Sequence, residues 1–572
     1  MILFLLFQIY YADTLIVEAT RLHIDPYKLP FFVEEVRFAK FHPLLFSLNL
    51  SSFLLNEYGG YVQLATSSIQ GLSSTNTLIT VNGLPLNTLK DNTFDLSLIP
   101  LCNLKRAEVI HSGYSLACGA HGLNLINITY DADEKSNFRY FRGNYSEEML
   151  YMSIRRGTNP LFFGGLDAHN GKGFRDNSDF TKSSGVLGFT YSINDWEINL
   201  LSGGCVKKYG VPGPSPDTEP SIALLSDKQQ DRALFLTLSG KLLKKNFSLN
   251  VISGYAVYLI DYKSAYGEDT IYSDILNFSA NLSKPPFYLN FDARNYKAFF
   301  RSSGFEYYDK REWECGASLT FFRKIFKPFL LTGIRFDKSS RYKGKFSGVT
   351  GISVPFSFFN LYFSYSQGFQ YPSFNDLYWP NTGWAEGNPE LLPEKGKFYN
   401  AGIKMKKSNM FLNLNLFKNY IRDKIEWVQD TDFVYRPKNL VNYEREGVEM
   451  VYKFSMLKVE YIQNLLFFFK DYEGIPRVKF VMTLRYKSFL TPEITYIYRG
   501  KMHKAYGDKE KILNDYHLLN IGFVYQFRDF LNIYLRCENL FDVDYKMCFG
   551  FSPFDTYPGR PRIIHIGIGM KF

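Results

Sequence analysis

The feature that most constrains this chain is a two-residue alternation of apolar and polar side chains that recurs from about residue 131 to its end. Successive side chains of a β-strand point to opposite faces, so this pattern gives each strand one apolar and one polar face. Helical periodicity is absent from these stretches. Clear examples are Leu276, Phe278, Ala280 and Leu282 against Asn277, Ser279 and Asn281; Leu412, Leu414 and Leu416 against Asn413 and Asn415; and Leu531, Ile533, Leu535 and Cys537 against Asn532, Tyr534, Arg536 and Glu538. The sequence predicts an all-β protein with many half-buried strands.

Two architectures use many alternating strands: a soluble sandwich or propeller, and a transmembrane barrel with lipid outside and a polar lumen inside. Aromatic residues make up 18% of the chain, and membrane barrels place aromatic girdles at both interfaces. A Tyr-rich soluble β-protein would share this composition, but no repeat of fixed period supports a propeller.

The end of the chain favours the membrane barrel. One face of the last predicted strand carries Ile564, Ile566, Ile568, Met570 and Phe572. In a soluble domain such an apolar strand without a polar tail would be an exposed edge. A closing strand that ends on an aromatic residue resembles the terminal strand of bacterial outer-membrane barrels, in which the barrel-assembly machinery reads the last residue. We therefore expect Phe572 to be this signal.

The predicted barrel spans residues 131–572, and its roughly 440 residues suffice for about 22 strands with their turns. A lumen that wide would be an open channel unless something filled it. Residues 18–130 have fewer aromatics and many Gly, Ser and Asn residues, which predicts a separate globular domain that plugs the barrel.

Several other classes of protein are disfavoured. Beyond Met1–Phe7 no apolar run approaches the length of a transmembrane helix. The six cysteines form no CxxC pair or metal-ligand cluster, and the net charge of +10 is scattered rather than gathered in a stripe, so nucleic-acid binding has little support. No nucleophile-base constellation, phosphate loop or HExxH site argues for an enzyme.

The first twelve residues are apolar but lack the positively charged start of a secretory signal. We interpret residues 1–12 as a truncated signal segment, with a core strand as the alternative. Cysteines of an exported chain would meet an oxidising compartment, so disulfide pairing stays open.

Four stretches, in order, resemble one family: the TonB-dependent outer-membrane receptors. They are Asp13-Thr14-Leu15-Ile16-Val17; a series from Ser68-Ile69-Gln70-Gly71 through Asn82-Gly83 to Ile126-Asn127-Ile128; Tyr365-Ser366-Gln367-Gly368-Phe369 with Gly387-Asn388-Pro389 and Glu446-Gly447-Val448-Glu449; and Glu538-Asn539-Leu540-Phe541-Asp542 with Pro558-Gly559-Arg560-Pro561. The resemblance spans nearly the whole chain, and the first stretch is closest to the form found in cobalamin receptors.

The resemblance implies a role for the segment that precedes the plug. Residues 13–17 would be the energy-coupling box, an extended segment able to add a strand to the sheet of a TonB-type inner-membrane partner; an ordinary β-strand is the alternative. Asn82-Gly83 between apolar runs predicts a tight turn.

Two plug residues depart from, or depend on, the family pattern. Gln70 stands where the family usually has an Arg that pairs with a Glu matching Glu108 to hold plug and barrel together. A lone buried carboxylate is costly, so Glu108 is expected to find another cation or a set of hydrogen-bond donors.

Candidate ligand contacts at the plug apex follow the Gly83-Leu84-Pro85-Leu86 turn; a solvated polar loop is the alternative. They are Asn87, Thr88, Lys90, Asp91, Asn92 and Thr93. A second candidate is an acidic group, Asp217, Glu219, Asp227 and Asp231, because carboxylate oxygens suit calcium and cobalamin receptors use loop carboxylates for it. The sequence favours a solvated acidic loop over a calcium site, and no cofactor is required.

The resemblance implies a monomeric receptor in the bacterial outer membrane that imports a scarce ligand, either cobalamin or a ferric siderophore or similar metal complex. Energy would come from the inner membrane through the coupling box, and no bond in the ligand would change. The alternatives are a passive channel or surface-binding receptor without energy coupling, and a soluble secreted β-protein.

Overall fold

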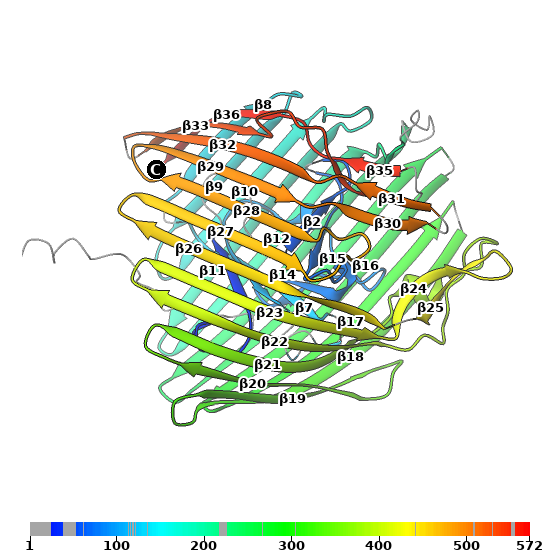
Figure 1. Cartoon of the computed structure of the whole chain (residues 1–572), viewed down its shortest axis with the longest axis horizontal. Helices are drawn as coiled ribbons and strands as arrows, with labels where there is room; N and C mark the ends of the chain where they lie inside the picture. The colour runs from blue at the N-terminus through cyan, green and yellow to red at the C-terminus, as the bar shows by residue number, and fades with distance from the viewer. Residues whose placement is uncertain are drawn as a thin grey trace, which may run out of the picture.

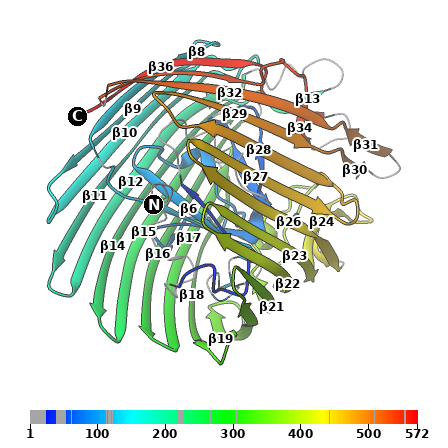
Figure 2. The ribbon, with the colours of Figure 1, turned by 60° about the vertical axis from the view of Figure 1, so that its left-hand side comes forward.

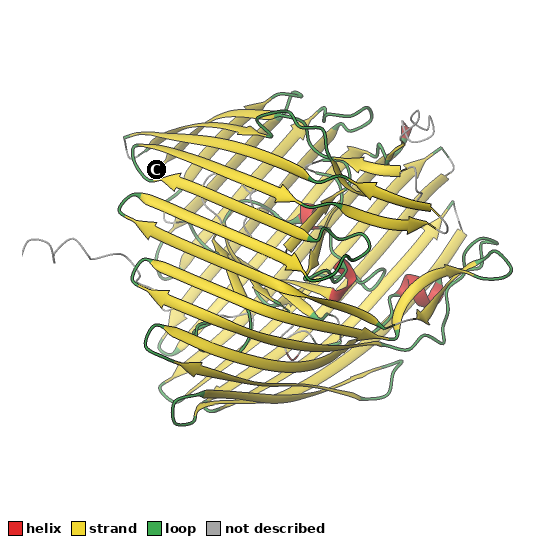
Figure 3. Ribbon diagram, viewed as in Figure 1, coloured by secondary structure: helices red, strands yellow, loops and turns green. Residues whose placement is uncertain are grey.

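The computed structural model describes residues 24–37, 53–60, 62–111, 114, 116, 119–120, 122–133, 135–216, 226–265, 267–303, 305–440, 442–506, 509–528, 530–550 and 555–572. Strands dominate these residues, with only short helical segments between them (Figure 3). Among the described residues, no helix is long and apolar enough to cross a membrane.

Twenty-two of the strands from residue 137 onward form a closed antiparallel barrel, as the sequence predicts. The barrel closes where β36 pairs with β8, with Ile568 opposite Tyr140. In chain order its strands are β8 (Asn137–Gly143), β9 (Glu148–Arg156), β10 (Leu161–Gly171), β11 (Phe180–Ile193), β12 (Trp196–Gly210), β14 (Lys228–Lys244), β15 (Phe247–Ser264), β16 (Gly267–Lys284), β17 (Phe287–Ser302), β18 (Phe305–Lys324), β19 (Phe329–Ser339), β20 (Lys345–Pro355), β21 (Phe359–Gln370), β22 (Glu394–Lys407), β23 (Met410–Arg422), β26 (Tyr443–Met456), β27 (Val459–Phe468), β28 (Val478–Tyr486), β29 (Leu490–Arg499), β32 (Tyr516–Phe527), β33 (Leu531–Glu538) and β36 (Ile563–Lys571).

The barrel wall carries its apolar side chains on the outside and its polar side chains on the inside. On β16 the outward-facing Leu276 is 54% exposed, whereas its neighbour Asn277 is 1% exposed. On β36, Ile566 faces outward and His565 is buried. An outer apolar surface around a polar interior is the arrangement that lipid requires of a spanning barrel.

The two ends of the barrel differ in their connections. At the end that holds the C-terminus, short turns such as 194–195, 245–246 and 408–409 join the strands (Figure 1). The opposite end carries the long loops, which are extracellular in barrels of this kind. These loops contain α1 (Phe374–Tyr378), β13 (Ser215–Pro216), β24 (Lys424–Gln429), β25 (Tyr435–Leu440), β30 (Met502–Tyr506), β31 (Lys509–Leu513), β34 (Lys546–Phe549) and β35 (Asp555–Pro558).

A five-stranded sheet lies inside the barrel (Figure 2). Its strands are β1 (Val33–Arg37), β6 (Leu104–Ile110), β7 (Asn124–Tyr130), β4 (Thr77–Val81) and β5 (Leu84–Pro85), in that order, with β4 and β7 parallel. A hairpin of β2 (Phe53–Glu57) and β3 (Ala65–Ile69) and the short helices η2 (Ser74–Asn76) and η3 (Leu96–Leu98) complete the described part of this plug.

The connection between β4 and β5 is the tight turn that Asn82-Gly83 predicts. Both residues have positive φ, 45° and 84°, which is the geometry of the two-residue hairpin turn that Asn-Gly favours. The Asn82 side-chain oxygen also accepts a hydrogen bond from the Tyr130 amide, 3.1 Å away, which ties the turn to the end of β7. The plug strands end at Tyr130 and the barrel begins at Asn137, so the predicted boundary between residues 130 and 131 lies between them.

Candidate functional site

The proposed coupling box, Asp13, Thr14, Leu15, Ile16 and Val17, lies outside the described residues, as do residues 1–12. The described residues begin at Ile24, seven residues after Val17. Leu29, Phe31 and Phe32 are fully buried, and Leu29 and Phe31 belong to a cluster that includes Leu331 of the wall. The described start of the chain is therefore packed between plug and barrel at Leu29 and Phe31.

Two lumenal side chains hold the backbone of this segment near the short-turn end. The ammonium of Lys404, on β22, donates to the carbonyl oxygens of Pro26, Leu29 and Phe31 at 2.7, 2.7 and 2.8 Å. The Asn360 amide, on β21, donates to the Tyr27 carbonyl at 2.7 Å. We refer to Lys404 and Asn360 as the basal clasp. Four carbonyls that no regular ladder satisfies thus obtain donors, one of them charged.

Gln70 connects the plug to the barrel in the middle of the lumen. Its amide donates to Glu449 Oε1 at 2.8 Å, and its carbonyl accepts from the Asn419 amide at 3.0 Å. Glu449, which is fully buried, also lies 2.8 Å from Nδ1 of His111 and accepts from Asn415. A neutral amide and an imidazole of the plug thus face a barrel carboxylate. The amide, that of Gln70, stands at the position where the resemblance implies an Arg.

Glu108 lies on β6, buried in the plug sheet. Its Oε1 lies 3.7 Å from the guanidinium of Arg106, and its Oε2 accepts from the Asn127 amide at 3.3 Å. These neighbours supply the cation and the donor that a buried carboxylate needs.

Near the long-loop end, Glu57 of β2 joins the last loop of the barrel. Arg560 donates to Glu57 at 3.1 Å and also pairs with Glu538 of β33 at 2.9 Å. Burial raises the pKa of the Glu57 carboxyl, and Arg560 opposes this shift. One guanidinium therefore ties the plug to both the wall and an extracellular loop.

The predicted apex residues form a loop whose amides are already engaged. Asn87 donates to the carbonyls of Thr77 and Asn92, and Asn92 donates to the Tyr371 carbonyl at 2.9 Å; both side chains are buried. The Asp91 carboxylate accepts from Thr93 and Thr88 and lies 3.8 Å from the Lys90 ammonium. Thr88, Lys90, Asp91 and Thr93 are half-buried, whereas the Asn87 and Asn92 amides are engaged inside the protein.

The helix α1 holds this apex loop from above. Ser373 caps α1 in a reciprocal box with Asp376, which is the pattern that stabilises a short helix start. The first amides of the helix, of Phe374 and Asn375, donate to the carbonyls of Leu89 and Lys90 at 2.7 and 2.9 Å. Helix N-terminal amides have no partner within the helix, so here they bind the plug.

An aromatic and cationic cluster lies beside α1. Tyr307 and Trp379 contact edge to face with ring centroids 5.5 Å apart, and the Arg341 guanidinium and Lys310 ammonium lie 5.3 and 5.1 Å from the Tyr378 ring. None of these five side chains is fully buried. Such a surface can bind a ligand that combines anionic and flat conjugated groups.

The structure describes two of the four residues in the proposed acidic group, Asp227 and Asp231. Asp217 and Glu219 lie outside the described residues. Asp231 pairs with Lys207 at 3.0 Å, and Lys207 also binds Asp95 of the plug at 2.5 Å, while Asp227 accepts from the Tyr262 hydroxyl. Asp227 and Asp231 are four residues apart in an extended segment, about 13 Å, too far to share one calcium ion with ligands at about 2.3–2.6 Å. The described residues contain no group of three or more His, Cys, Asp or Glu that could hold a metal.

Phe572 follows β36 and is 70% exposed, with its amide donating to the Ser136 carbonyl at 2.9 Å. Its ring is thus available at the short-turn end of the wall.

Sequence reasoning missed the residues that attach the plug to the wall: Lys207, Asn360, Lys404 and Arg560. Each of them could be recognised in the sequence as a charged or amide side chain that lies on the polar face of an alternating strand or next to such a strand. For example, Lys404 shares its phase with Asn400 on β22, and both are buried. The pattern marks such residues as lumenal but does not name their partners.

Comparison with known proteins identifies the family. Residues 120–540 match the TonB-dependent receptor-like β-barrel, and residues 49–124 match the TonB-dependent receptor plug domain. The vitamin B12 transporter BtuB of Vibrio vulnificus is 23% identical over 543 residues, which cover 86% of this chain and 84% of that protein. BtuB of Photobacterium profundum is 21% identical, with 85% and 84% covered.

Solved structures share the fold. The ferripyoverdine receptor of the outer membrane of Pseudomonas aeruginosa, bound to ferripyoverdine, has a TM-score of 0.82 at 14% identity, with 97% of this chain and 88% of that chain covered. The ferric enterobactin receptor PfeA of P. aeruginosa has a TM-score of 0.77 at 13% identity, with 98% and 100% covered. The barrel, the plug inside it and the match of both family models lead to one conclusion: this chain belongs to the TonB-dependent receptors, a family of receptors and transporters in the bacterial outer membrane.

Proposed function

We propose that this protein imports a scarce metal complex across the outer membrane and that residues 13–17 couple the import to an inner-membrane partner of the TonB type. The observation that carries the proposal is the attachment of the plug inside the lumen through buried polar contacts at three levels: the basal clasp, Gln70 with Glu449, and Lys207 with Asp95. A filled lumen favours a gated transporter over a passive channel, because movement of the ligand then requires the plug to move.

The basal clasp gives a physical reason for energy coupling. The first carbonyl that it holds, that of Pro26, lies nine residues after Val17 of the proposed box, so a pull on the box would first act on the carbonyls bound by Lys404 and Asn360. Separating a buried ammonium from three carbonyls costs several kcal/mol. The outer membrane has no ion gradient of its own to supply this, so the work would come from mechanical contact with the inner membrane.

The ligand would bind between the apex loop and the aromatic and cationic cluster beside α1. The curated relatives are named as vitamin B12 transporters, and the structural neighbours include receptors for ferripyoverdine and ferric enterobactin. Arg341 and Lys310 over an aromatic ring support an anionic, conjugated chelate, whereas the relatives favour cobalamin. We retain both ligand classes, with cobalamin first.

The test is uptake of labelled cobalamin, ferripyoverdine and ferric enterobactin by cells that produce either the intact chain or one lacking residues 13–17. Each is measured with and without a proton uncoupler. We expect uptake of one ligand that requires both residues 13–17 and the proton gradient. Equilibrium binding of that ligand should survive the deletion, because the box would lie on the periplasmic side.

Two outcomes would contradict the proposal. Uptake that ignores both the deletion and the uncoupler would assign the protein to the passive channels. Loss of ligand binding together with uptake would show that residues 13–17 do more than couple energy.

A further inference from the structure

A histidine of the plug lies between two buried carboxylates in the middle of the lumen. Nδ1 of His111 lies 2.8 Å from Glu449 of β26, and its Nε2 lies 3.9 Å from Glu34 of β1. All three residues are at most 4% exposed. His111 directly follows β6, and its backbone amide donates to the Phe32 carbonyl at 3.4 Å. The charge of this imidazole therefore acts where the plug sheet meets the wall.

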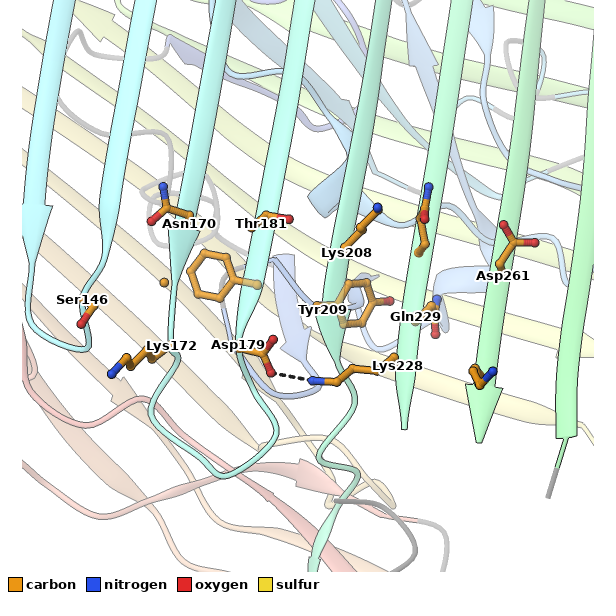
Figure 4. Close-up of a pocket in the computed structure, with 14 residues that line it drawn as sticks. Ser146, Asn170, Lys172, Asp179, Thr181, Lys208, Tyr209, Lys228, Gln229 and Asp261 are labelled. Atoms are coloured by element: carbon orange, nitrogen blue, oxygen red, sulfur yellow. Dashed lines mark hydrogen bonds and ion pairs between the residues drawn. The ribbon is translucent and has the colours of Figure 1, made fainter. Parts of the chain in front are cut away.

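Burial makes these contacts different from the ion pairs at the rim of the barrel. The Lys228 ammonium and the Asp179 carboxylate, for example, lie 2.7 Å apart at the long-loop end, where both side chains are more than half exposed (Figure 4). Water and salt screen such a pair, so it contributes little to stability. The carboxylates beside His111 have lost most of their water, so a neighbouring charge has a larger effect on them.

The two protonation states of His111 hold the carboxylates differently. A histidine side chain changes its charge between pH 5 and 8. The charged ring has a donor on both nitrogens and attracts both Glu34 and Glu449, whereas the neutral ring has one donor and no charge. Gln70, which also donates to Glu449, is a neutral amide. The Arg that the resemblance implies at that position would keep its charge at every physiological pH.

Two other titratable groups act on the same carboxylates. Lys479 of β28 interacts electrostatically with Glu34, and Tyr362 of β21 interacts with Glu449. A phenol keeps its proton between pH 5 and 8, so Tyr362 does not change over this range. Lys479 also supplies a cation to Glu34. A fixed charge at residue 111 would leave Lys479 to titrate by itself, which separates its contribution from that of His111.

We propose that His111 makes the attachment of the plug to the wall depend on pH. The folded protein favours the charged ring, because two buried carboxylates flank it. This contribution is present in mildly acidic solution and is lost as the pH rises and the ring loses its proton. A pull on residues 13–17 would then need more work in acid than in alkali. That regulatory role rests on the proposed function, whereas the pH-dependent attachment can be measured without a ligand.

The test is hydrogen-deuterium exchange of the purified full chain in detergent at pH 5.5 and pH 8.0. A peptide that covers residues 104–111 is followed, and its protection is expressed relative to the intrinsic exchange rate at each pH. One proton changes an equilibrium by at most about tenfold per pH unit, and we expect protection about tenfold greater at pH 5.5. His111→Arg should keep the high protection at both pH values, and His111→Gln should have the low protection at both.

A second variant, Gln70→Arg with His111→Gln, moves a fixed charge to the neighbouring plug residue and should also be independent of pH. The matched control is His517→Gln on β32, whose side chain is 59% exposed; it should keep the pH difference of the unaltered chain. Equal protection of the unaltered chain at both pH values would overturn the proposal. A pH difference that persists in His111→Arg and His111→Gln would also overturn it and would assign the titration to Lys479. Absence of ligand uptake, with the pH difference intact, would contradict the proposed function alone.

Discussion

Replacing Lys404 by Met tests the basal clasp most directly. Met keeps the length and flexibility of the side chain but removes the ammonium that donates to the Pro26, Leu29 and Phe31 carbonyls. The Pro26 carbonyl keeps the Leu29 amide as a donor at 3.3 Å. Each carbonyl left without a donor costs about 1–3 kcal/mol, and relief from burying an ammonium returns several kcal/mol. We expect a net loss of about 2–3 kcal/mol, confined to the segment that the clasp holds.

The assay is hydrogen-deuterium exchange of the intact protein in detergent, followed on a peptide that covers residues 24–37. A local loss of 2–3 kcal/mol predicts exchange faster by about 30- to 150-fold, at about 1.4 kcal/mol per factor of ten. Asn360→Ala removes one neutral hydrogen bond to this segment, about 1 kcal/mol, and should speed its exchange only about fivefold; the other bond of Asn360, from the Ser353 hydroxyl, lies within the wall. Lys397→Met, an outward-facing lysine of the same strand, is the matched control and should change nothing.

The reasoning would be refuted by unchanged exchange of residues 24–37 in Lys404→Met. An equal acceleration in remote strands such as β14 would show general destabilisation in place of local release.

Three further predictions follow from buried groups. Gln70→Leu removes a donor from Glu449 and should lower the free energy of unfolding by about 2–4 kcal/mol. Gln70→Arg should lower it by less, because the Arg offers that carboxylate a cation. Thermal unfolding of both variants in detergent measures the difference. Lys207→Met leaves the buried Asp231 and the half-buried Asp95 without their shared cation and should cost about 3–5 kcal/mol. A thermal midpoint equal to that of the unaltered chain would contradict the assigned pairs. Burial raises the pKa of the Cys102 thiol, and it raises the pKa of the Cys548 thiol to about 12. A raised pKa lowers the reactive thiolate fraction, so maleimide at pH 7.5 should label neither thiol until the protein unfolds. Peptide mass spectrometry would detect the label.

The polar partners in the lumen explain why site prediction was less complete than fold prediction. Gln70 meets Glu449, which is 379 residues away in the sequence, and no local pattern links the two. Asn87 and Asn92 resemble exposed loop residues, yet Thr77 of the plug accepts from the Asn87 amide and Tyr371 of a barrel loop accepts from the Asn92 amide. Asp231 lies close to a loop in the sequence, but the phase of β14 turns it inward to Lys207.

The sequence by itself determined the features that depend on near neighbours along the chain. The alternation fixes two faces per strand, the number of residues limits the number of strands, and Asn82-Gly83 sets its own turn, because each follows from backbone geometry over a few residues. Only the tertiary structure decided which lumenal side chain meets which plug residue. Those arrangements depend on strand register and on closure of the barrel, which bring together residues that the chain itself keeps far apart.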